Sequence, residues 1–215
     1  MPFKGFPAEA FDFFEGLEAD NTKTYWQANK PLYERAVKAP MDALLADLAS
    51  EFGPGRVFRP HRDVRFSNDK SPYKTNIGAV AERDGSVFYV SLSTGGLFAG
   101  SGYYRMARDQ LQRFRAAVAS DHGEQLEALV DQADTAGFEV GGEALKSAPR
   151  GYAGDHPRIR LLRHKGVTIG RSWEPTAWMG TAKCAGRVAD VWRAAGPING
   201  WLQAHVGPST EPHSR

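Results

Sequence analysis

The period of the hydrophobic pattern changes twice along this chain, and no other feature restricts its fold as much. Apolar residues recur at helical spacing up to residue 52, at every second position between about residues 58 and 104, and at helical spacing again from residue 111. A period of about 3.6 residues indicates helices with one buried face, whereas a period of 2 indicates half-buried strands. The pattern predicts an α+β protein in which helices from both ends of the chain pack on one face of a sheet.

Helices are predicted in the first quarter of the chain and again after the sheet. Pro7 opens a helix over residues 7–19, Asn21 caps a second helix, and Pro40 opens a third. Pro31 falls inside the second helix, where its missing N–H predicts a kink or a break. Later helices are predicted over residues 111–118 and 126–133, briefly after Pro157, and over residues 181–202.

Four short strands joined by tight turns are predicted between these helical regions. The first strand begins at Phe58, and the others cover residues 73–81, 87–92 and 97–104. Asp84-Gly85 and Gly95-Gly96 supply turn residues that accept positive φ angles. Consecutive strands with such short connections indicate an antiparallel meander. A short strand at 167–169 is expected to add to its edge, which makes a sheet of about four to five strands.

Length and composition are those of one globular domain. The chain has 215 residues, of which 41% are hydrophobic and 24% charged. No low-complexity linker interrupts it, so residues 1–206 are expected to form a single domain and residues 207–215 a mobile polar tail. The first residues do not resemble a secretory leader, and no apolar run approaches membrane-spanning length. We therefore expect a cytoplasmic protein without a membrane partner.

Several classes of site are excluded by what the sequence lacks. Cys184 is the only cysteine, so there is no internal disulfide or cysteine-based zinc cage, and its side chain is expected to be buried on a helix. The sequence has no phosphate-binding loop, HExxH motif, calcium loop or nucleophile elbow. No carboxylate lies between His156 and His164, which does not favour a metal site. We expect neither a metal nor a cofactor.

Basic residues are concentrated in two segments, although the net charge is only +2. Residues 56–74 carry six basic and two acidic side chains, and residues 143–171 carry seven basic and two acidic ones. If the two segments meet in space, they form an electropositive face or cleft that attracts an anionic partner.

The first basic segment contains the stretch RFSNDKSPYK, which combines an arginine fork with two lysines and a tyrosine. Such a group can hold a phosphate or a carboxylate. Asp63 and Asp69 lie beside cations, so they are expected to stay ionised and to hold the neighbouring arginines or Lys70 in position rather than to act as bases. On the predicted strand, Phe58, Val64 and Phe66 share one face, and Arg59, His61, Asp63, Arg65 and Ser67 share the other.

The run RDVRFSNDKSPYKTN, residues 62–76, resembles the signature of domain-of-unknown-function family 2461, which comprises bacterial and fungal proteins. Three further parts of the chain resemble other segments of that family: Asn21, Trp26, Asn29 and Tyr33; Gly100-Ser101-Gly102-Tyr103; and PRGYAGDHPRIRLLRHKG, residues 149–166. The resemblance covers most of the chain. It implies membership of the family, which brings no activity with it.

The same resemblance marks Asp155-His156-Pro157, within the second basic segment. We therefore expect the hairpin of residues 62–76 and the segment 155–165 to form a basic pocket for a small phosphate- or carboxylate-bearing ligand. His156 is the candidate catalytic acid–base group, because histidine titrates near neutral pH and neighbouring cations lower its pKa. Helix capping is its alternative role. The candidate ligand-binding residues are Arg62, Asp63, Arg65, Ser67, Asp69, Lys70, Tyr73, Lys74, Arg163 and Lys165.

Two other functions stay open. A nucleic-acid-binding module would use the basic segments for phosphates and the aromatic residues Tyr73, Tyr103, Tyr104 and Trp173 for stacking. In a structural or interaction protein, the charges of the hairpin would form a salt-bridge lattice that pins it. Trp26 and Tyr33 lie on the apolar stripe of their helix and are expected in the core rather than at a ligand. Neither a reaction nor an oligomeric state follows from the sequence.

Overall fold

The computed structural model describes residues 2–65 and 69–211. Helices flank one six-stranded sheet with the strand order β1-β2-β3-β4-β6-β5. The strands are β1 (Gly55–Val57), β2 (Asn76–Arg83), β3 (Ser86–Ser93), β4 (Gly96–Tyr103), β5 (Glu139–Gly141) and β6 (Val167–Trp173). The predicted α+β class and antiparallel meander are confirmed, and the sheet has six strands instead of four to five.

The chain divides into two compact units, which are described separately. Unit 1 contains Met1–Arg83, Phe88–Ala99 and Ser172–Asp190, and unit 2 contains Asp84–Val87, Gly100–Arg171 and Val191–Arg215. Strands β3, β4 and β6 contribute residues to both units. The single domain expected over residues 1–206 stays a prediction.

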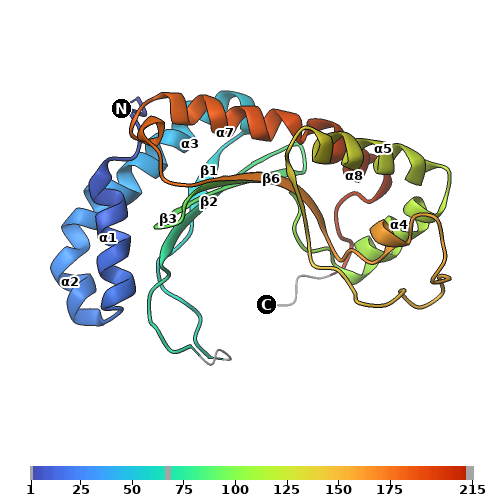
Figure 1. Ribbon diagram of the computed structural model, residues 1–215, viewed down its shortest axis with the longest axis horizontal. Helices are drawn as coiled ribbons and strands as arrows, with labels where there is room; N and C mark the ends of the chain where they lie inside the picture. Colours follow the sequence, from blue (N-terminus) through green and yellow to red (C-terminus); the bar gives the residue numbers. More distant parts are fainter. Residues whose placement is uncertain (1, 66–68, 212–215) are drawn as a thin grey trace. The chain divides into compact units, whose positions relative to one another are not determined.

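Unit 1 begins with a long helical run. Its elements are α1 (Ala8–Ala19), α2 (Lys23–Leu32), a π-helix (Tyr33–Lys38) and α3 (Ala39–Phe52). Helices α1 and α2 lie side by side (Figure 1). Thr22 caps α2, because its hydroxyl oxygen accepts the N–H of Tyr25 at 3.2 Å, so the predicted capping by Asn21 is wrong. The chain does not break at Pro31 but continues as the π-helix, in keeping with the N–H that proline cannot donate.

The core of unit 1 combines an aromatic cluster with the apolar face of α3. The Phe13 and Trp26 rings meet edge to face with centroids 5.8 Å apart, and Tyr33 lies 4.8 Å from Trp26. Helix α3 packs on β1 and β2 and buries Met41 and Leu44 completely. Trp26 and Tyr33 are buried, which confirms that they belong to the core.

The turns of the meander follow the sequence prediction closely. Asp84 and Gly85 join β2 to β3 with φ angles of 50° and 79°, as a two-residue hairpin turn requires. Strand β6 adds to the meander beside β4, as predicted, and β5 pairs with it on the other side, so β5 and not β6 forms the edge of the sheet. Gly102 allows the close approach of β4 and β6, because a Cβ there would lie 2.3 Å from the carbonyl oxygen of Val167.

The prediction of a strand that begins at Phe58 is wrong. Strand β1 ends before Phe58, and the chain then forms a loop that leads to β2. An isolated β-bridge between His61 and Tyr73 connects the two arms of this loop. Pro60 and Pro72 lie beside the bridge, and neither has an N–H to continue a ladder of hydrogen bonds.

Unit 2 is built around four helices that pack on one another. They are α4 (Arg108–Ala119), α5 (His122–Thr135), α6 (Ile159–Leu162) and α8 (Gly196–His205). Phe114, Leu126, Leu161 and Trp201 supply one large side chain from each helix to the common core. Helices α4, α5 and α6 confirm those predicted over residues 111–118 and 126–133 and after Pro157, whereas the helix predicted over residues 181–202 is divided into two, of which α8 is the second.

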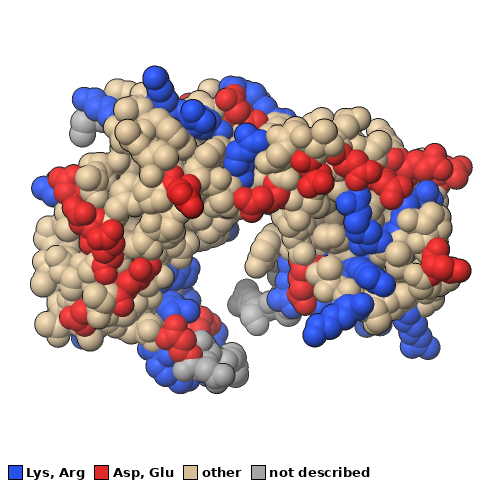
Figure 2. All heavy atoms as spheres, viewed as in Figure 1, with Lys and Arg blue, Asp and Glu red and all other residues tan. Residues whose placement is uncertain are grey.

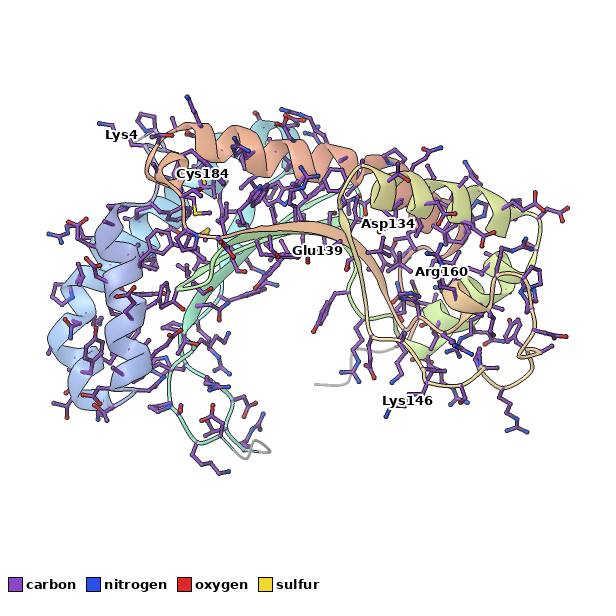
Figure 3. The ribbon with its side chains drawn as sticks, viewed as in Figure 1. Lys4, Asp134, Glu139, Lys146, Arg160 and Cys184 are labelled. Atoms are coloured by element: carbon purple, nitrogen blue, oxygen red, sulfur yellow. The ribbon has the colours of Figure 1, made fainter. Side chains whose placement is uncertain are left out.

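Two further helical elements precede α8. A short 3-10 helix covers Ala177–Gly180, and α7 covers Lys183–Ala194. Cys184 is fully buried near the start of α7 (Figure 3), as predicted. Burial raises the pKa of its thiol to about 12, so the side chain packs as a small apolar group.

Arginine side chains close the C-terminal ends of helices in unit 2. Arg158 donates from Nε to the carbonyl oxygen of Val118 at 2.7 Å and from Nη2 to that of Ser120 at 3.0 Å. Arg171 donates to the carbonyl oxygen of Ala136 at 2.7 Å, at the end of α5. The last carbonyls of a helix lack helical partners and carry the negative end of its dipole, so a cation there is stabilising.

The chain after α8 is hydrogen-bonded to α4. The Asp109 carboxylate accepts hydrogen bonds from the Thr210 N–H at 2.8 Å and the Ser209 hydroxyl at 2.7 Å, and Arg113 donates to the Pro208 carbonyl oxygen at 2.7 Å. The pKa of the Asp109 carboxyl is lowered, mainly because the carboxylate accepts a hydrogen bond from the Thr210 N–H. The mobility expected of this tail stays a prediction.

Replacing Gly102 by alanine is expected to destabilise the protein by about 2–4 kcal/mol. Its φ of +133° is unfavourable for any residue with a Cβ, and the new methyl group would collide with the Val167 carbonyl. Gly186 in α7 is the matched control, because it has open space around its Cβ position. Gly186→Ala should be neutral or stabilising by up to about 1 kcal/mol. Urea unfolding followed by circular dichroism measures both, and equal midpoints would contradict the close packing of β4 and β6.

Arg158→Met is expected to lower the free energy of unfolding by about 1–3 kcal/mol, since it leaves helix carbonyls without donors. Arg160 offers the control (Figure 3), because it pairs with Asp131 at the surface and both side chains are more than half exposed. Arg160→Met should change stability by no more than about 0.5 kcal/mol. The same urea measurement compares them, and a smaller loss for Arg158→Met than for Arg160→Met would show that the cap is not stabilising.

Candidate functional site

The loop between β1 and β2, residues 58–75, forms a hairpin whose arms are joined at its base. The N–H of Arg62 donates to the Pro72 carbonyl oxygen at 2.9 Å, and the N–H of Lys74 donates to the Pro60 carbonyl oxygen at 2.8 Å. We call residues 58–75 the hairpin loop. These hydrogen bonds fix the base of the loop, and its described residues, 58–65 and 69–75, contain no regular strand.

Charged side chains of the hairpin loop pair with one another. Arg65 donates two hydrogen bonds to the Asp63 carboxylate, from Nε to Oδ1 at 2.9 Å and from Nη2 to Oδ2 at 2.7 Å. Arg62 forms an ion pair with Asp69. Lys70 donates to a backbone carbonyl of the same loop at 3.0 Å. Acidic and basic side chains are accordingly intermixed on this loop (Figure 2). The predicted role of the two aspartates as holders of neighbouring cations is confirmed.

These hydrogen bonds also fix the ionisation of the two aspartates. The Arg65 side chain is the main cause that lowers the pKa of the Asp63 carboxyl to about 2. Hydrogen bonds from Ser71, and then from Arg62, lower the pKa of the Asp69 carboxyl. Both groups are ionised at neutral pH and are poor general bases, as predicted.

Tyr73 is part of the core of unit 1. Its side chain is 5% exposed, and its ring stacks flat on Trp26 with centroids 4.4 Å apart and planes 9° apart. The Asn21 side chain holds the Tyr73 backbone by donating to its carbonyl oxygen at 3.0 Å and accepting its N–H at 3.1 Å. The structure therefore gives Tyr73 a packing role and leaves little of its ring for a ligand or a base.

Lys74 lies beside an aromatic side chain at the base of the hairpin loop. Its ammonium group is 5.6 Å from the centroid of the Phe58 ring, and the Arg56 guanidinium is 5.2 Å from the same centroid. Both distances suit a cation–π contact. Ser67, a candidate ligand-binding residue, and Phe66, predicted to point inward, lie outside the described residues.

The second basic segment belongs to unit 2, where several of its side chains have local partners. His156 Nδ1 accepts the N–H of Arg158 at 3.0 Å, but Arg158 is itself the N-cap of α6 and that helix has no side-chain cap, so the alternative capping role of His156 is wrong. Lys165 pairs with Glu143. Arg163 has a buried Nε for which the described part of the chain supplies no acceptor. The basic pocket shared with the hairpin and the catalytic role of His156 stay predictions.

A groove of about 380 Å³ lies in unit 1, next to the point where the hairpin loop leaves β1. Its lining combines aromatic rings with three cations and one acid, and we call it the aromatic groove. The lining residues are Trp26, Lys30, Tyr33, Glu34, Lys38, Val57, Phe58, Arg59, Pro60 and His61.

Tyr33 is a buried residue of the aromatic groove whose polar group makes no hydrogen bond to the described residues. The side chain is 4% exposed, and its hydroxyl has no hydrogen-bond partner within residues 2–65 and 69–211. Burial, and then the charges of Glu34 and Asp42, raise the pKa of Tyr33 to about 12. The hydroxyl is therefore protonated at neutral pH and can donate a hydrogen bond.

Cations and an imidazole accompany this hydroxyl. Lys30 and Arg59 are exposed, and neither has an ion-pair partner among the described residues. Lys38 pairs with Asp42 at 2.8 Å. His61 is also exposed, with its ring 5.1 Å from that of Tyr73. Such a set can bind an anion through point charges, one tyrosine donor and a titratable ring.

The aromatic groove was not predicted from the sequence. Part of its signal was present, because Trp26, Lys30 and Tyr33 are spaced so that they share one side of an α-helix. Lys38 does not fall on that side by α-helical spacing and lines the groove from the end of the π-helix. From the sequence, Trp26 and Tyr33 were assigned to the apolar stripe, and Lys30 and Lys38 were given no role. Arg59 was placed on a polar face without a role.

Within the described parts of the chain, no group of three histidine, cysteine, aspartate or glutamate side chains could hold a metal ion. None of the described helices combines the length and the apolar character needed to cross a bilayer.

Comparison with curated proteins finds no match, and comparison with solved structures finds none either. A family model described as a conserved hypothetical protein (DUF2461) matches residues 9–201. The match includes the hairpin loop, the aromatic groove and the second basic segment, and it covers most of the chain. The chain therefore belongs to the DUF2461 family of conserved hypothetical proteins.

Proposed function

We propose that this protein binds a small phosphate- or carboxylate-bearing ligand in the aromatic groove of unit 1. The observation that carries the proposal is the buried Tyr33, whose protonated hydroxyl has no partner among the described residues and which lines a groove together with Lys30 and Arg59. A buried ring with an unused donor next to unpaired cations favours an anionic ligand with acceptor oxygens.

The charge and size of the groove support this class of ligand. Lys30, Lys38 and Arg59 stand against a single acid, Glu34, so the lining carries a net positive charge. A volume of about 380 Å³ suits a small metabolite, and it lies within the range of about 300–1,000 Å³ typical of ligand pockets. His61 is the imidazole of the groove, so a proton transfer to or from the ligand would fall to this side chain.

The charges of the hairpin loop have a supporting role in this proposal. The pairs of Arg65 with Asp63 and of Arg62 with Asp69 hold the loop beside Arg59 and His61, which reach the groove. The salt-bridge lattice considered from the sequence is thus compatible with ligand binding by neighbouring residues. We place the protein in the cytoplasm, where its single thiol would stay reduced.

Two substitutions in the aromatic groove test the proposal with pyrophosphate and citrate as probes. Arg59→Gln should weaken binding by about tenfold, because it removes a charge-assisted hydrogen bond, and Tyr33→Phe by about fivefold, because it removes only a neutral donor. Isothermal titration calorimetry measures both dissociation constants. Arg35→Gln is the control, because Arg35 follows Tyr33 on the same helical segment and is absent from the lining. Absence of saturable binding by the wild type, or equal binding by Arg59→Gln and Arg35→Gln, would contradict the proposal.

The hairpin loop is tested separately by the titration of Asp63. Carboxyl carbon shifts measured by NMR should give an Asp63 pKa of about 2 in the wild type. In Arg65→Gln the pKa should rise toward the ordinary value of about 3.9, because the charge-assisted hydrogen bonds are lost. A lowered folded-state pKa stabilises the fold above the unfolded value, so the contribution of this pair is present above about pH 4 and is lost as the pH falls toward 2. An unchanged Asp63 pKa in Arg65→Gln would show that the pair does not form in solution.

A further inference from the structure

Unit 2 contains a second and larger cavity, of about 550 Å³, beside the ends of β4 and α8. Its lining includes Val87, Tyr103, Tyr104, Arg105, Gln203 and Pro208, and we call it the tyrosine pocket. In contrast to the aromatic groove, it presents mostly apolar and aromatic surface with few charges. Its volume lies within the range typical of small-molecule sites.

Hydrogen bonds of the lining residues with one another and with their neighbours fix the walls of the tyrosine pocket. Gln110 donates from Nε2 to the Gly207 carbonyl oxygen at 2.8 Å, and Gln203 donates from Nε2 to the Ser86 hydroxyl at 2.6 Å. The Pro208 carbonyl oxygen accepts from Arg113 at 2.7 Å. A site whose walls are fixed before binding loses little conformational entropy when a ligand enters.

A buried polar chain fixes the strands behind these walls. The Ser101 hydroxyl donates to the Val87 carbonyl oxygen at 2.7 Å and accepts from Asn199 Nδ2 at 2.8 Å. Ser101 and Asn199 are each only 3% exposed. Hydrogen bonds between buried polar groups are strong, so this series of hydrogen bonds holds α8 against β3 and β4 next to the pocket.

Several polar groups in the lining of the tyrosine pocket take no part in the hydrogen bonds that fix its walls. The Tyr103 hydroxyl, the Arg105 guanidinium and Gln203 Oε1 make no hydrogen bond or close ion pair in the part of the chain that the structure describes, although the charge of Arg105 contributes to lowering the pKa of the Glu143 carboxyl. Tyr104 is 81% exposed and Val87 is 37% exposed, which is unusual for large apolar side chains of this protein. The pocket thus offers two donors, one acceptor and apolar surface to a molecule from solution.

We propose that the tyrosine pocket is a binding site for a ring-bearing, mostly apolar molecule with a single carboxylate or sulfonate group. Its rings would contact Val87, Tyr104 and Pro208, and its anionic group would accept hydrogen bonds from Arg105 and Tyr103. The lining contains one acidic residue, Asp84, and one basic residue, Arg105, so it carries no net charge. A ligand with several phosphates is therefore disfavoured here, whereas it fits the aromatic groove.

The fluorescent probe 8-anilinonaphthalene-1-sulfonate has this chemistry, and its emission rises when it enters an apolar site. We expect the folded wild-type protein to bind it at one site, with changes in the backbone amide NMR shifts of Gly85, Gly102 and Gly207. Arg105→Gln should raise its dissociation constant about tenfold, through loss of a charge-assisted hydrogen bond. Tyr104→Ala should raise it about fivefold, through loss of an aromatic contact.

Arg150→Gln is the matched control, because Arg150 is an exposed arginine of unit 2 outside the pocket lining. Arg59→Gln and Tyr33→Phe, which test the aromatic groove, should leave probe binding unchanged, so the two proposals fail independently. Cooperative urea unfolding confirms that each variant is folded. Equal probe affinity in Arg105→Gln and Arg150→Gln would overturn the proposal, as would shift changes confined to residues outside the tyrosine pocket.

Discussion

The side chain of Asn21 holds the hairpin loop against the helices of unit 1. Its amide group pairs with both the N–H and the carbonyl oxygen of Tyr73, where Pro72 prevents a normal ladder of hydrogen bonds. Because a buried backbone group needs a partner, this contact fixes one arm of the loop and lets the Tyr73 ring stack on Trp26. The opposite arm, which carries Arg59 and His61 to the aromatic groove, is joined to the first by hydrogen bonds at its base. The geometry of the candidate site in unit 1 therefore depends on one amide side chain.

Many of the basic side chains that are prominent in the sequence have partners within the protein. Arg158 and Arg171 cap helices, whereas Arg65, Arg62 and Lys165 pair with acidic side chains. Arginine suits these roles because its planar fork can reach several carbonyl or carboxylate oxygens at once. An excess of basic residues in a segment is thus a weak indicator of a ligand site. More informative are groups that the described structure leaves without a hydrogen-bond partner, such as the Tyr33 hydroxyl and Arg105.

Local signals predicted most elements of the fold. Asp84-Gly85 identified a hairpin turn, Pro40 marked the beginning of α3, and the apolar spacing located α4, α5 and the burial of Cys184. The errors arose where a non-local contact decided the outcome. Asn21 has the chemistry of a helix cap, but it bonds to Tyr73, 52 residues away, and Thr22 takes the cap. Strand β5 pairs with β6 at the edge of the sheet, which no local pattern of residues 139–141 could reveal.

The candidate sites show more clearly which features depend on the sequence alone and which depend on the tertiary structure. The sequence by itself determined the α+β class, the family and the pairing of Asp63 and Asp69 with nearby cations, because these depend on periodicity, on motif and on charges a few residues apart. Only the tertiary structure decided which side chains are left with unused hydrogen-bonding capacity, because that depends on every neighbour in space. In the tertiary structure, Tyr73 is buried against Trp26, Arg158 caps the end of a helix, and Tyr33 and Arg59 line one groove. The physical reason is that burial and hydrogen bonding are set by contacts between distant parts of the chain.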